Sequence, residues 1–403
     1  MMKTLRYRPY SLNSKPLIGA FCLAGLILLI GLGAAWYMEH NGHVVTGMDN
    51  QIVWGLPHVF AVFLIVAASG ALNVASMGSV FGRTAYKPLA RLSGLSAMAL
   101  LMGGLAVLVL DLGRPDRLIV AMTSYNFKSI FAWNIILYTG LLGITAVYLW
   151  TMMERRMNGY TKLAGLIAFL WRLALTTGTG LIFGFLVARQ AYDAAVMAPL
   201  FIAMSFAFGL AMFILIVLGL YEGDGRPLGG YIINRMGKLL GVFVGAVLYF
   251  TFVQHATNLY APEHHAVERF ILLDGGGITG LFWVGQVLVG GLLPLLVLFP
   301  LGGGKLSSCR VALAALLVIA GGFAQIYVII IGGQSFPLVL FPGWEESSSF
   351  FDGVTASYSA SLPELMLGIG GVAIAALIVL VGAKVLNFMP VSLADEQIDP
   401  HHT

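Results

Sequence analysis

A histidine at the start of a long apolar run is the first side chain that could do chemistry. The run is entered through Trp54-Gly55-Leu56-Pro57-His58. Proline suits the first turn of a helix, so His58 is expected about one turn inside. A histidine there can donate a hydrogen bond and carry a proton near neutral pH. The alternative is a structural histidine, satisfied by a neighbouring carbonyl group.

A charged loop follows a later apolar run, at residues 110–117. Gly113 can close the preceding helix in a left-handed conformation, and Pro115 prevents that helix from continuing. Opposite charges in the loop can pair and hold it in one conformation. For Asp111 and Arg114 this structural role is the simpler interpretation. The charged residues of the loop are Asp111, Arg114, Asp116 and Arg117.

Three hydrogen-bonding side chains come next, before another apolar run: Tyr125, Asn126 and Ser129. Their position in the sequence places them at the same end of the protein as His58. Two sets of polar groups on different helices could hold a flat ring that carries two oxygen atoms. The sequence therefore predicts a binding site for such a ring, with His58 on one side and this segment on the other.

The composition indicates whether these side chains lie in a water-soluble protein or in a membrane protein. The chain is 59% hydrophobic and 10% charged, with a mean hydropathy of +0.90, whereas soluble domains carry about 25% charged residues. One membrane span needs about 20 apolar residues, so the chain has room for roughly ten. We expect an all-α integral membrane protein. A formal charge of +4, spread along the sequence, does not suggest a nucleic-acid partner.

The apolar runs predict ten membrane-spanning helices in a single polytopic domain, residues 1–403. No segment between them is long enough to form a core of its own. The expected spans are 16–38, 53–82, 91–110, 129–152, 162–188, 196–221, 237–259, 277–300, 308–332 and 363–388.

The positions of lysine and arginine predict the orientation. Most of them fall on the side of the N-terminus, which is therefore expected in the cytoplasm. An even number of spans then returns the C-terminus to the same side. The long loops 260–276 and 333–362 lie outside, and an extracytoplasmic partner is the natural expectation for them; a disordered loop is the alternative.

Metal and haem chemistry have little support in the sequence. The two cysteines, Cys22 and Cys309, form no CxxC pair, so this chain alone cannot supply the four thiolates of an iron–sulfur cluster. We expect no metal site. A b-type cytochrome would need two facing histidines, and His58 and His255 are one possible pair near the ends of their spans.

Polar side chains inside the later spans could line a path for water. Arg172 lies about half-way along its span, His255 near the end of another, and Gln286 within a third. Intramembrane polar groups are costly and therefore candidates for function. The alternative is ordinary hydrogen bonding between helices, worth about 0.6 kcal/mol per pair.

The charged loop carries a family resemblance. The segment 111–115 (Asp-Leu-Gly-Arg-Pro), followed by Asn126, Ser129 and Trp133, resembles the NrfD / polysulfide reductase membrane-subunit family. The resemblance extends over most of the chain and favours the ten-helix branch, which includes the membrane subunit of uptake hydrogenases. Within it, the chain looks most like the DsrP-type subunit of sulfite-reductase-associated DsrMKJOP complexes. The further segments that carry this similarity are 54–55, 69–70, 198–201, 282–283 with Gln286, and 341–345.

The resemblance implies two four-helix bundles, about 53–188 and 196–332, with one flanking helix at each end. It also implies a haem-free quinone site in the first bundle, beside an extracytoplasmic iron–sulfur subunit. His58, Tyr125 and Asn126 match the family's quinone ligands. Further haem-bearing and cytoplasmic subunits, and a bacterial cytoplasmic membrane, are also implied. In the second bundle, relatives carry charged residues where this chain has His255, Asn258 and Gln286, which argues against a transmembrane proton path.

We therefore expect a quinone-interacting subunit of a respiratory or sulfur-metabolism oxidoreductase complex, rather than an enzyme acting alone. His58 would bond to the ring and relay protons, and Asp111 and Arg114 would order the loop. Menaquinone or ubiquinone would be an exchangeable substrate, and neither haem nor an iron–sulfur cluster would be held by this chain. A stand-alone transporter or ion channel, and a b-type cytochrome, are the alternatives.

Overall fold

The computed structural model describes residues 6–11, 14–300, 306–338 and 353–399. These residues form helices and no strand, and ten helical segments are long and apolar enough to cross a membrane. The prediction of an all-α, ten-span protein is confirmed, and the chain is a multi-pass integral membrane protein. The motif expected at 341–345 lies outside the described residues.

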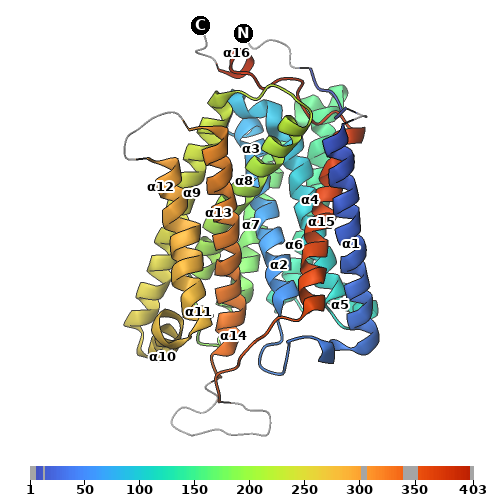
Figure 1. Ribbon diagram of the computed structural model, residues 1–403. Coiled ribbons are helices and arrows are strands. Elements are labelled where there is room, and N and C mark those ends of the chain that lie inside the picture. The colour runs from blue at the N-terminus through green and yellow to red at the C-terminus, as the bar shows by residue number, and fades with distance from the viewer. Residues whose placement is uncertain (1–5, 12–13, 301–305, 339–352, 400–403) are drawn as a thin grey trace.

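Most spans are single helices that cross the bundle from end to end (Figure 1). The exceptions are the second span, which is broken into two helices, and the eighth and ninth, which contain π-helical segments at Leu281–Leu292 and Val328–Gly332. In chain order the helices of the spans are α1 (Lys15–Asn41), α2 (Leu56–Ala71) with α3 (Asn73–Ser79), α4 (Ala90–Leu110), α6 (Ile130–Met153), α7 (Thr161–Gly184), α8 (Met197–Gly223), α9 (Gly230–Tyr260), α11 (Gly277–Gly280) with α12 (Leu293–Leu298), α13 (Ser308–Tyr327) with α14 (Gly333–Ser335), and α15 (Leu362–Val385).

The break between α2 and α3 has a side-chain cause. The Ser93 hydroxyl, from α4, donates to the Ala71 carbonyl oxygen at 2.6 Å and accepts the Ala75 N–H at 3.0 Å. In an unbroken helix that N–H and that carbonyl would bond to each other, because they are four residues apart. A hydroxyl inserted into the ladder is a recognised cause of a helix kink. The single helix expected over 53–82 is therefore two.

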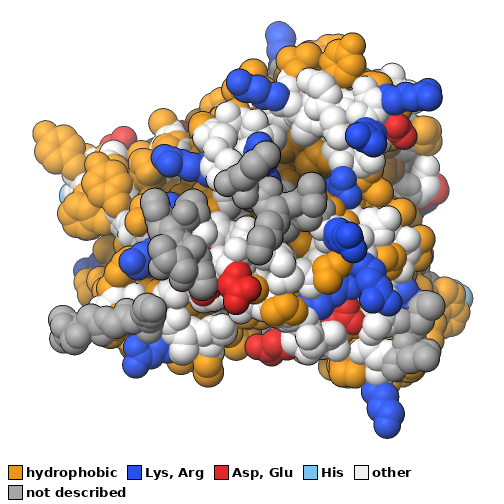
Figure 2. All heavy atoms as spheres, turned by 90° about the horizontal axis from the view of Figure 1, so that it is seen from above, with side chains coloured by type: hydrophobic (Ala, Val, Ile, Leu, Met, Phe, Trp, Pro, Cys, Tyr) orange, Lys and Arg blue, Asp and Glu red, His pale blue; other side chains and the backbone are white. Residues whose placement is uncertain are grey.

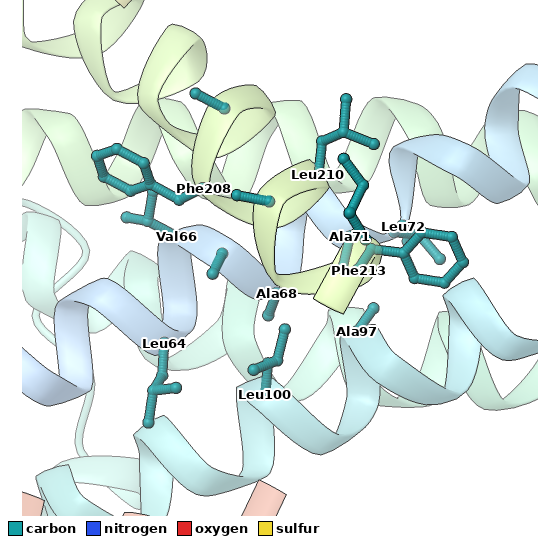
Figure 3. Close-up of a cluster of buried hydrophobic side chains, with 14 of the residues drawn as sticks. Leu64, Val66, Ala68, Ala71, Leu72, Ala97, Leu100, Phe208, Leu210 and Phe213 are labelled. Carbon is teal, nitrogen blue, oxygen red and sulfur yellow. The ribbon is translucent and has the colours of Figure 1, made fainter. Parts of the chain in front are cut away.

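Helices α2 and α8 meet at the centre of the bundle with almost no side chain between them. A Cβ added to Gly70 would lie 1.6 Å from the Ser205 carbonyl oxygen, and one added to Gly209 would lie 2.3 Å from the Ala71 nitrogen. Without a hydrophobic drive in lipid, such close backbone approach lets helices associate. Around this contact, buried side chains of α2, α4 and α8 interdigitate (Figure 3), including Leu64, Leu72, Leu100, Phe208 and Phe213.

Helices α2 and α8 join the first and second halves of the chain. Helix α2 packs against α4 and α8, whereas α8 also packs against α7, α9 and α13. On the outside of the bundle, α1 packs along α15, and α15 contacts α4 and α2. The division into two four-helix bundles stays a prediction.

Both termini lie at one end of the bundle (Figure 1), here called the terminal face. Seen from that side, Lys and Arg side chains are spread over it (Figure 2), as expected for a cytoplasmic surface. The other end is called the opposite face; it carries the start of α2, the short helix α5 (Leu118–Thr123) and the short helix α10 (His265–Arg269).

Arg226 ties the terminal face together. Its guanidinium donates to the carbonyl oxygens of Arg8 and Pro9 near the N-terminus and of Met389 and Pro390 near the C-terminus, at 2.6–3.3 Å. It also pairs with Asp224 at 2.5 Å. Burial raises the pKa of the Asp224 carboxyl, but hydrogen bonds from Ser11 and the charge of Arg226 outweigh it, so the pKa is lowered. The carboxylate therefore stays ionised and paired.

Replacing Gly209 with Ala should destabilise the protein, because the added methyl group must push the α2 backbone away. We expect a loss of about 1–3 kcal/mol in the free energy of unfolding, measured as a lower melting temperature of the purified protein in detergent. Gly143→Ala, in α6, is the matched control, since nothing lies within 4 Å of its added Cβ. Equal melting temperatures for the two variants would contradict a tight α2–α8 contact.

Candidate functional site

His58 lies in the first turn of α2, at the opposite face, and faces a buried carboxylate. Its Nδ1 is 2.8 Å from Oδ2 of Asp111, whose side chain is 1% exposed, against 19% for His58. Asp111 follows the last turn of α4. His58 Nδ1 and both Asp111 oxygens have no hydrogen-bond partner among the described residues, so the two side chains lie at ion-pair distance without hydrogen-bond geometry. With Nδ1 beside the carboxylate, Nε2 is the ring nitrogen left for other groups.

The pairing of the charged loop differs in part from the expectation. Arg114 pairs with Asp116 at 3.1 Å, and both side chains are more than half exposed. The hydrogen bond from Arg114 is the main cause that lowers the pKa of the Asp116 carboxyl. Arg117 is exposed. Asp111 does not join these residues, because its side chain turns inward to His58.

One aromatic ring, that of Trp54, lies against the histidine and is itself in contact with two others. The Trp54 ring is stacked with that of His58, with centroids 6.0 Å apart and planes at 24°. Trp54 also contacts Phe131, at the start of α6, and Phe183, in α7, at 6.1 and 6.0 Å. The site thus combines one imidazole ring with the flat apolar faces of neighbouring aromatic rings.

The segment before α2 is held by hydrogen bonds from residues that are distant in the sequence. The buried Gln334 side chain accepts the Trp54 N–H and donates to the Trp54 carbonyl, both at 3.0 Å. Arg189 donates to the carbonyl oxygens of Gln334 and Gln51 at 2.9 and 2.7 Å. Sequence reasoning missed Gln334 and Arg189, because no local pattern links positions so far apart.

A second set of hydrogen bonds, here called the clamp, holds the first residue of α2 through Tyr358 and Glu364. The Tyr358 hydroxyl accepts the Leu56 N–H at 2.7 Å and donates to the buried Glu364 carboxylate at 2.5 Å. The other oxygen of Glu364 accepts the N–H groups of Gly47 and Ser361 at 2.8 and 2.7 Å. Burial, followed by the hydrogen bond to Glu364, raises the pKa of the Tyr358 hydroxyl, which therefore remains a donor.

The other predicted ring ligands lie near this cluster without touching His58. The Tyr125 ring contacts Phe127, and the Asn126 side chain accepts the Lys128 N–H at 3.1 Å. Ser129 precedes α6. Within the described residues none of the three forms a hydrogen bond with His58. Their segment reaches the site through Phe131, which contacts Trp54.

A second histidine–carboxylate pair lies at the same face in the second half of the protein. Nδ1 of His255, in α9, is 2.6 Å from Oε2 of Glu268, and the Asn258 amide donates to the other oxygen at 2.8 Å. Glu268 is 1% exposed and comes from α10. The prediction against a proton path rests only on the charged residues that relatives carry where this chain has His255, Asn258 and Gln286. It misses Glu268, because the loop that carries this carboxylate folds back onto His255.

Deeper in the second half, a few amides continue from this pair. Gln286 and Gln325 both donate to the Thr251 hydroxyl, at 3.5 and 3.1 Å. Beside them are two small cavities of about 20 and 10 Å³, each about the size for one water molecule. Gln286 lies on the π-helical segment Leu281–Leu292, a conformation often found at functional sites.

Arg172 is separate from these amides. Its buried guanidinium donates to the Asn73 side chain at 3.0 Å and to the Ser69 carbonyl at 3.4 Å. The rings of Phe169 and Phe206 cover it at 4.7 and 5.1 Å. It therefore contacts α2, α3 and α8 around the helix break, and within the described part of the protein it forms no hydrogen bond with His255 or Gln286.

Replacing Tyr358 with Phe should weaken the α2 N-terminus, because the Leu56 N–H and one Glu364 oxygen would both lose their partner. A buried unsatisfied polar group costs about 1–3 kcal/mol, so the melting temperature in detergent should fall. Tyr37→Phe, on the exposed side of α1, is the control. A melting temperature unchanged in Tyr358→Phe would show that the clamp adds no stability.

Comparisons with known proteins identify the family. The family model "Polysulphide reductase, NrfD" matches residues 44–338. An Hdr-like menaquinol oxidoreductase integral membrane subunit of Archaeoglobus fulgidus is 28% identical over 93% of this chain and 94% of its own length. The C subunit of the selenate reductase of Mesobacillus selenatarsenatis is 21% identical over 95% and 96%. The C polypeptide of the polysulfide reductase of Wolinella succinogenes is 26% identical over 71% and 96%. Since the family model spans most of the sequence, from before α2 to the end of α14, this protein belongs to the NrfD family of polysulphide reductase membrane proteins.

Proposed function

We propose that this chain is the quinone-reactive membrane subunit of a multi-subunit oxidoreductase. It exchanges electrons between the quinone pool and an iron–sulfur subunit on the extracytoplasmic side. The observation that carries the proposal is the His58–Asp111 pair, which places a proton-carrying ring against a buried carboxylate beside the Trp54 ring. Menaquinone is the favoured quinone, since a relative similar over nearly the whole chain is named as a menaquinol oxidoreductase subunit.

The chemistry requires that electrons and protons leave a quinol by different routes. Oxidation of one quinol releases two electrons and two protons. Nε2 of His58 would bond to one ring oxygen and take its proton as general base. Asp111, at Nδ1, stabilises the charge that the ring then carries and can pass a proton on toward the opposite face. The stacked ring of Trp54 provides a flat face for the substrate.

The second ring oxygen needs its own partner. In this proposal Tyr125 or Asn126 provides it, with Ser129 nearby, and Arg114, Asp116 and Arg117 order the loop between α4 and α6. This assignment is supported by the course of the loop, which continues into Phe131, a residue in contact with Trp54. Because these side chains are at least partly exposed, they are free to turn toward a bound ring.

An iron–sulfur partner fits the surface next to this site. Apolar side chains that a partner could cover are exposed there, among them Ile119, Val120 and Phe127. The sequence has only two cysteines, Cys22 and Cys309, so the clusters would belong to the partner. We propose a DsrMKJOP-like assembly with further haem-bearing and cytoplasmic subunits, in which this chain is the DsrP-type subunit in a bacterial cytoplasmic membrane.

A second candidate function concerns the other half of the protein. We propose that His255, Glu268 and Gln286 form a polar path that opens at the opposite face and ends near Thr251. The buried His255–Glu268 pair favours it. Beyond Thr251 the neighbouring α9 positions are apolar, including Val244, Val247 and Leu248, so the path is a half-channel that exchanges protons with one side.

The alternatives make different predictions for the purified material. A b-type cytochrome would show haem absorption in the visible spectrum of the isolated protein. A stand-alone transporter or ion channel would purify without redox subunits and would remain active. The proposed quinone-reactive subunit should instead co-purify with iron–sulfur subunits.

Replacing His58 with Ala should slow quinol-linked turnover by roughly 100-fold, because the ring oxygen would lose its base. Turnover is measured with a menaquinol analogue on the purified complex, and the presence of every subunit is checked by gel. His40→Ala, which removes an exposed histidine of α1, is the control. Unchanged turnover in an intact His58→Ala complex would remove His58 from the mechanism.

Replacing Glu268 with Gln should reduce the number of protons that the complex takes up from the side of the opposite face, because the His255 ring would lose its charged partner. Uptake is measured with a pH-sensitive dye outside vesicles that expose this face, after a rapid drop in external pH, with electron transfer recorded in parallel. Glu263→Gln, on the same loop but exposed, is the control. Unchanged proton uptake in Glu268→Gln would rule out the proposed half-channel.

A further inference from the structure

A large apolar cavity lies on the terminal-face side of the bundle, away from both histidine–carboxylate pairs. Its volume is about 460 Å³, within the range of ligand pockets. Helices α1, α8 and α15 form its walls with side chains such as Leu23, Ile27, Leu215, Ile216 and Val372. Tyr10 and Gly223 close the end nearest the terminal face.

The cavity exists because α1 is held on one side only. Helix α1 packs along α15, and the cavity separates its first half from the second half of α8. In the hydrocarbon layer a gap of this size does not stay empty, because protein interiors are packed like organic crystals. Nor does it fill with water, since apolar cavities stay dry and accept apolar ligands.

Two lysines lie beside the cavity, at the ends of α1 and α15 that are nearest the terminal face. Lys15 is the first residue of α1, next to Pro16 of the lining, and Lys384 lies in the last turn of α15, one turn beyond Leu380 of the lining. The Lys384 ammonium lies 5.7 Å from the centre of the Phe21 ring, on α1, so it reaches across from one wall to the other. Basic groups at cytoplasmic pockets between helices bind anionic headgroups.

We propose that this cavity binds an anionic phospholipid of the leaflet at the terminal face. One acyl tail fills the space between α1, α8 and α15, and the phosphate lies near Lys15 and Lys384. The lipid thereby completes the packing of α1 against the bundle. This site is independent of the proposed quinone chemistry, which lies at the opposite face.

The side chains that line the cavity favour an acyl tail over a quinone ring. A quinone needs a hydrogen-bond partner for each of its two oxygens, and among the described residues of the lining only Tyr10 has a polar side chain. An acyl tail needs none. The charges at the rim also favour an anionic headgroup over a zwitterionic one.

The test compares variants of the complex purified in mild detergent, with bound lipid identified by native mass spectrometry. Gly219→Leu places a side chain in the cavity, where nothing lies within 4 Å of the added Cβ. We expect it to lose the bound phospholipid at least several-fold, and Gly143→Leu, on α6, to retain it. An unchanged lipid content in Gly219→Leu, or a quinone found in its place in the wild type, would overturn the proposal.

The headgroup is tested separately, by the rise in melting temperature that phosphatidylglycerol produces relative to phosphatidylcholine. The wild type should show the larger rise with phosphatidylglycerol. Lys15→Gln combined with Lys384→Gln should abolish that difference, and Lys238→Gln, an exposed lysine of α9 on the same face, should keep it. A wild type that does not distinguish the two lipids would overturn the assignment of an anionic headgroup, even if Gly219→Leu failed to fold.

Discussion

The backbone contact between α2 and α8 is the constraint on which the rest of the molecule depends. Gly70 and Gly209 let the two helices approach until no side chain fits between them. Helix α2 carries His58 and packs on α4, which ends at Asp111, so the distance between these residues follows from how α2 sits. Helix α8 carries the contacts with α7, α9 and α13. The contact between α2 and α8 thus positions the His58 site and connects it to the second half of the chain.

The same arrangement of charge recurs in both halves. Each has a histidine at the opposite face, with Nδ1 within 2.8 Å of a carboxylate that is 1% exposed. Only the His255–Glu268 contact has the geometry of a hydrogen bond. The carboxylates come from different places: Asp111 from the end of a membrane helix, Glu268 from a short helix in a loop. Burying an unpaired carboxylate is expensive, whereas a histidine partner can share a proton with it. Each buried carboxylate therefore has a histidine as its neighbour at the same face of the protein.

Hydropathy predicted the spans because a long apolar helix satisfies its own backbone polar groups in lipid, whatever its neighbours. His58 could be found for a similar reason: Pro57 fixes the start of a helix, and a histidine one residue later has to lie near the boundary. The sequence identified Asp111 but predicted the wrong partners for it. Its partner, His58, lies 53 positions away, whereas Arg114 and Arg117 lie beside it in the same loop. Gln334, Tyr358 and Glu364 hold the segment around Trp54 and Leu56 from about 280 to 317 positions away. No local sequence pattern predicts those contacts. The break that the Ser93 hydroxyl causes in the second span could not be predicted either, because Ser93 lies on another helix.

The Arg226 contacts have a consequence for how the protein is made. This side chain binds carbonyl groups of residues 8–9 and 389–390 at once, and residues 389–390 leave the ribosome after the ten spans of the described residues. The terminal face can therefore close only after residue 390 has been synthesised and the segments around residues 8 and 390 lie on the same side of the membrane. Until then the guanidinium and the carbonyls it binds must be satisfied by water, so a truncated or inverted polypeptide would expose an unfinished surface to the proteases of that compartment.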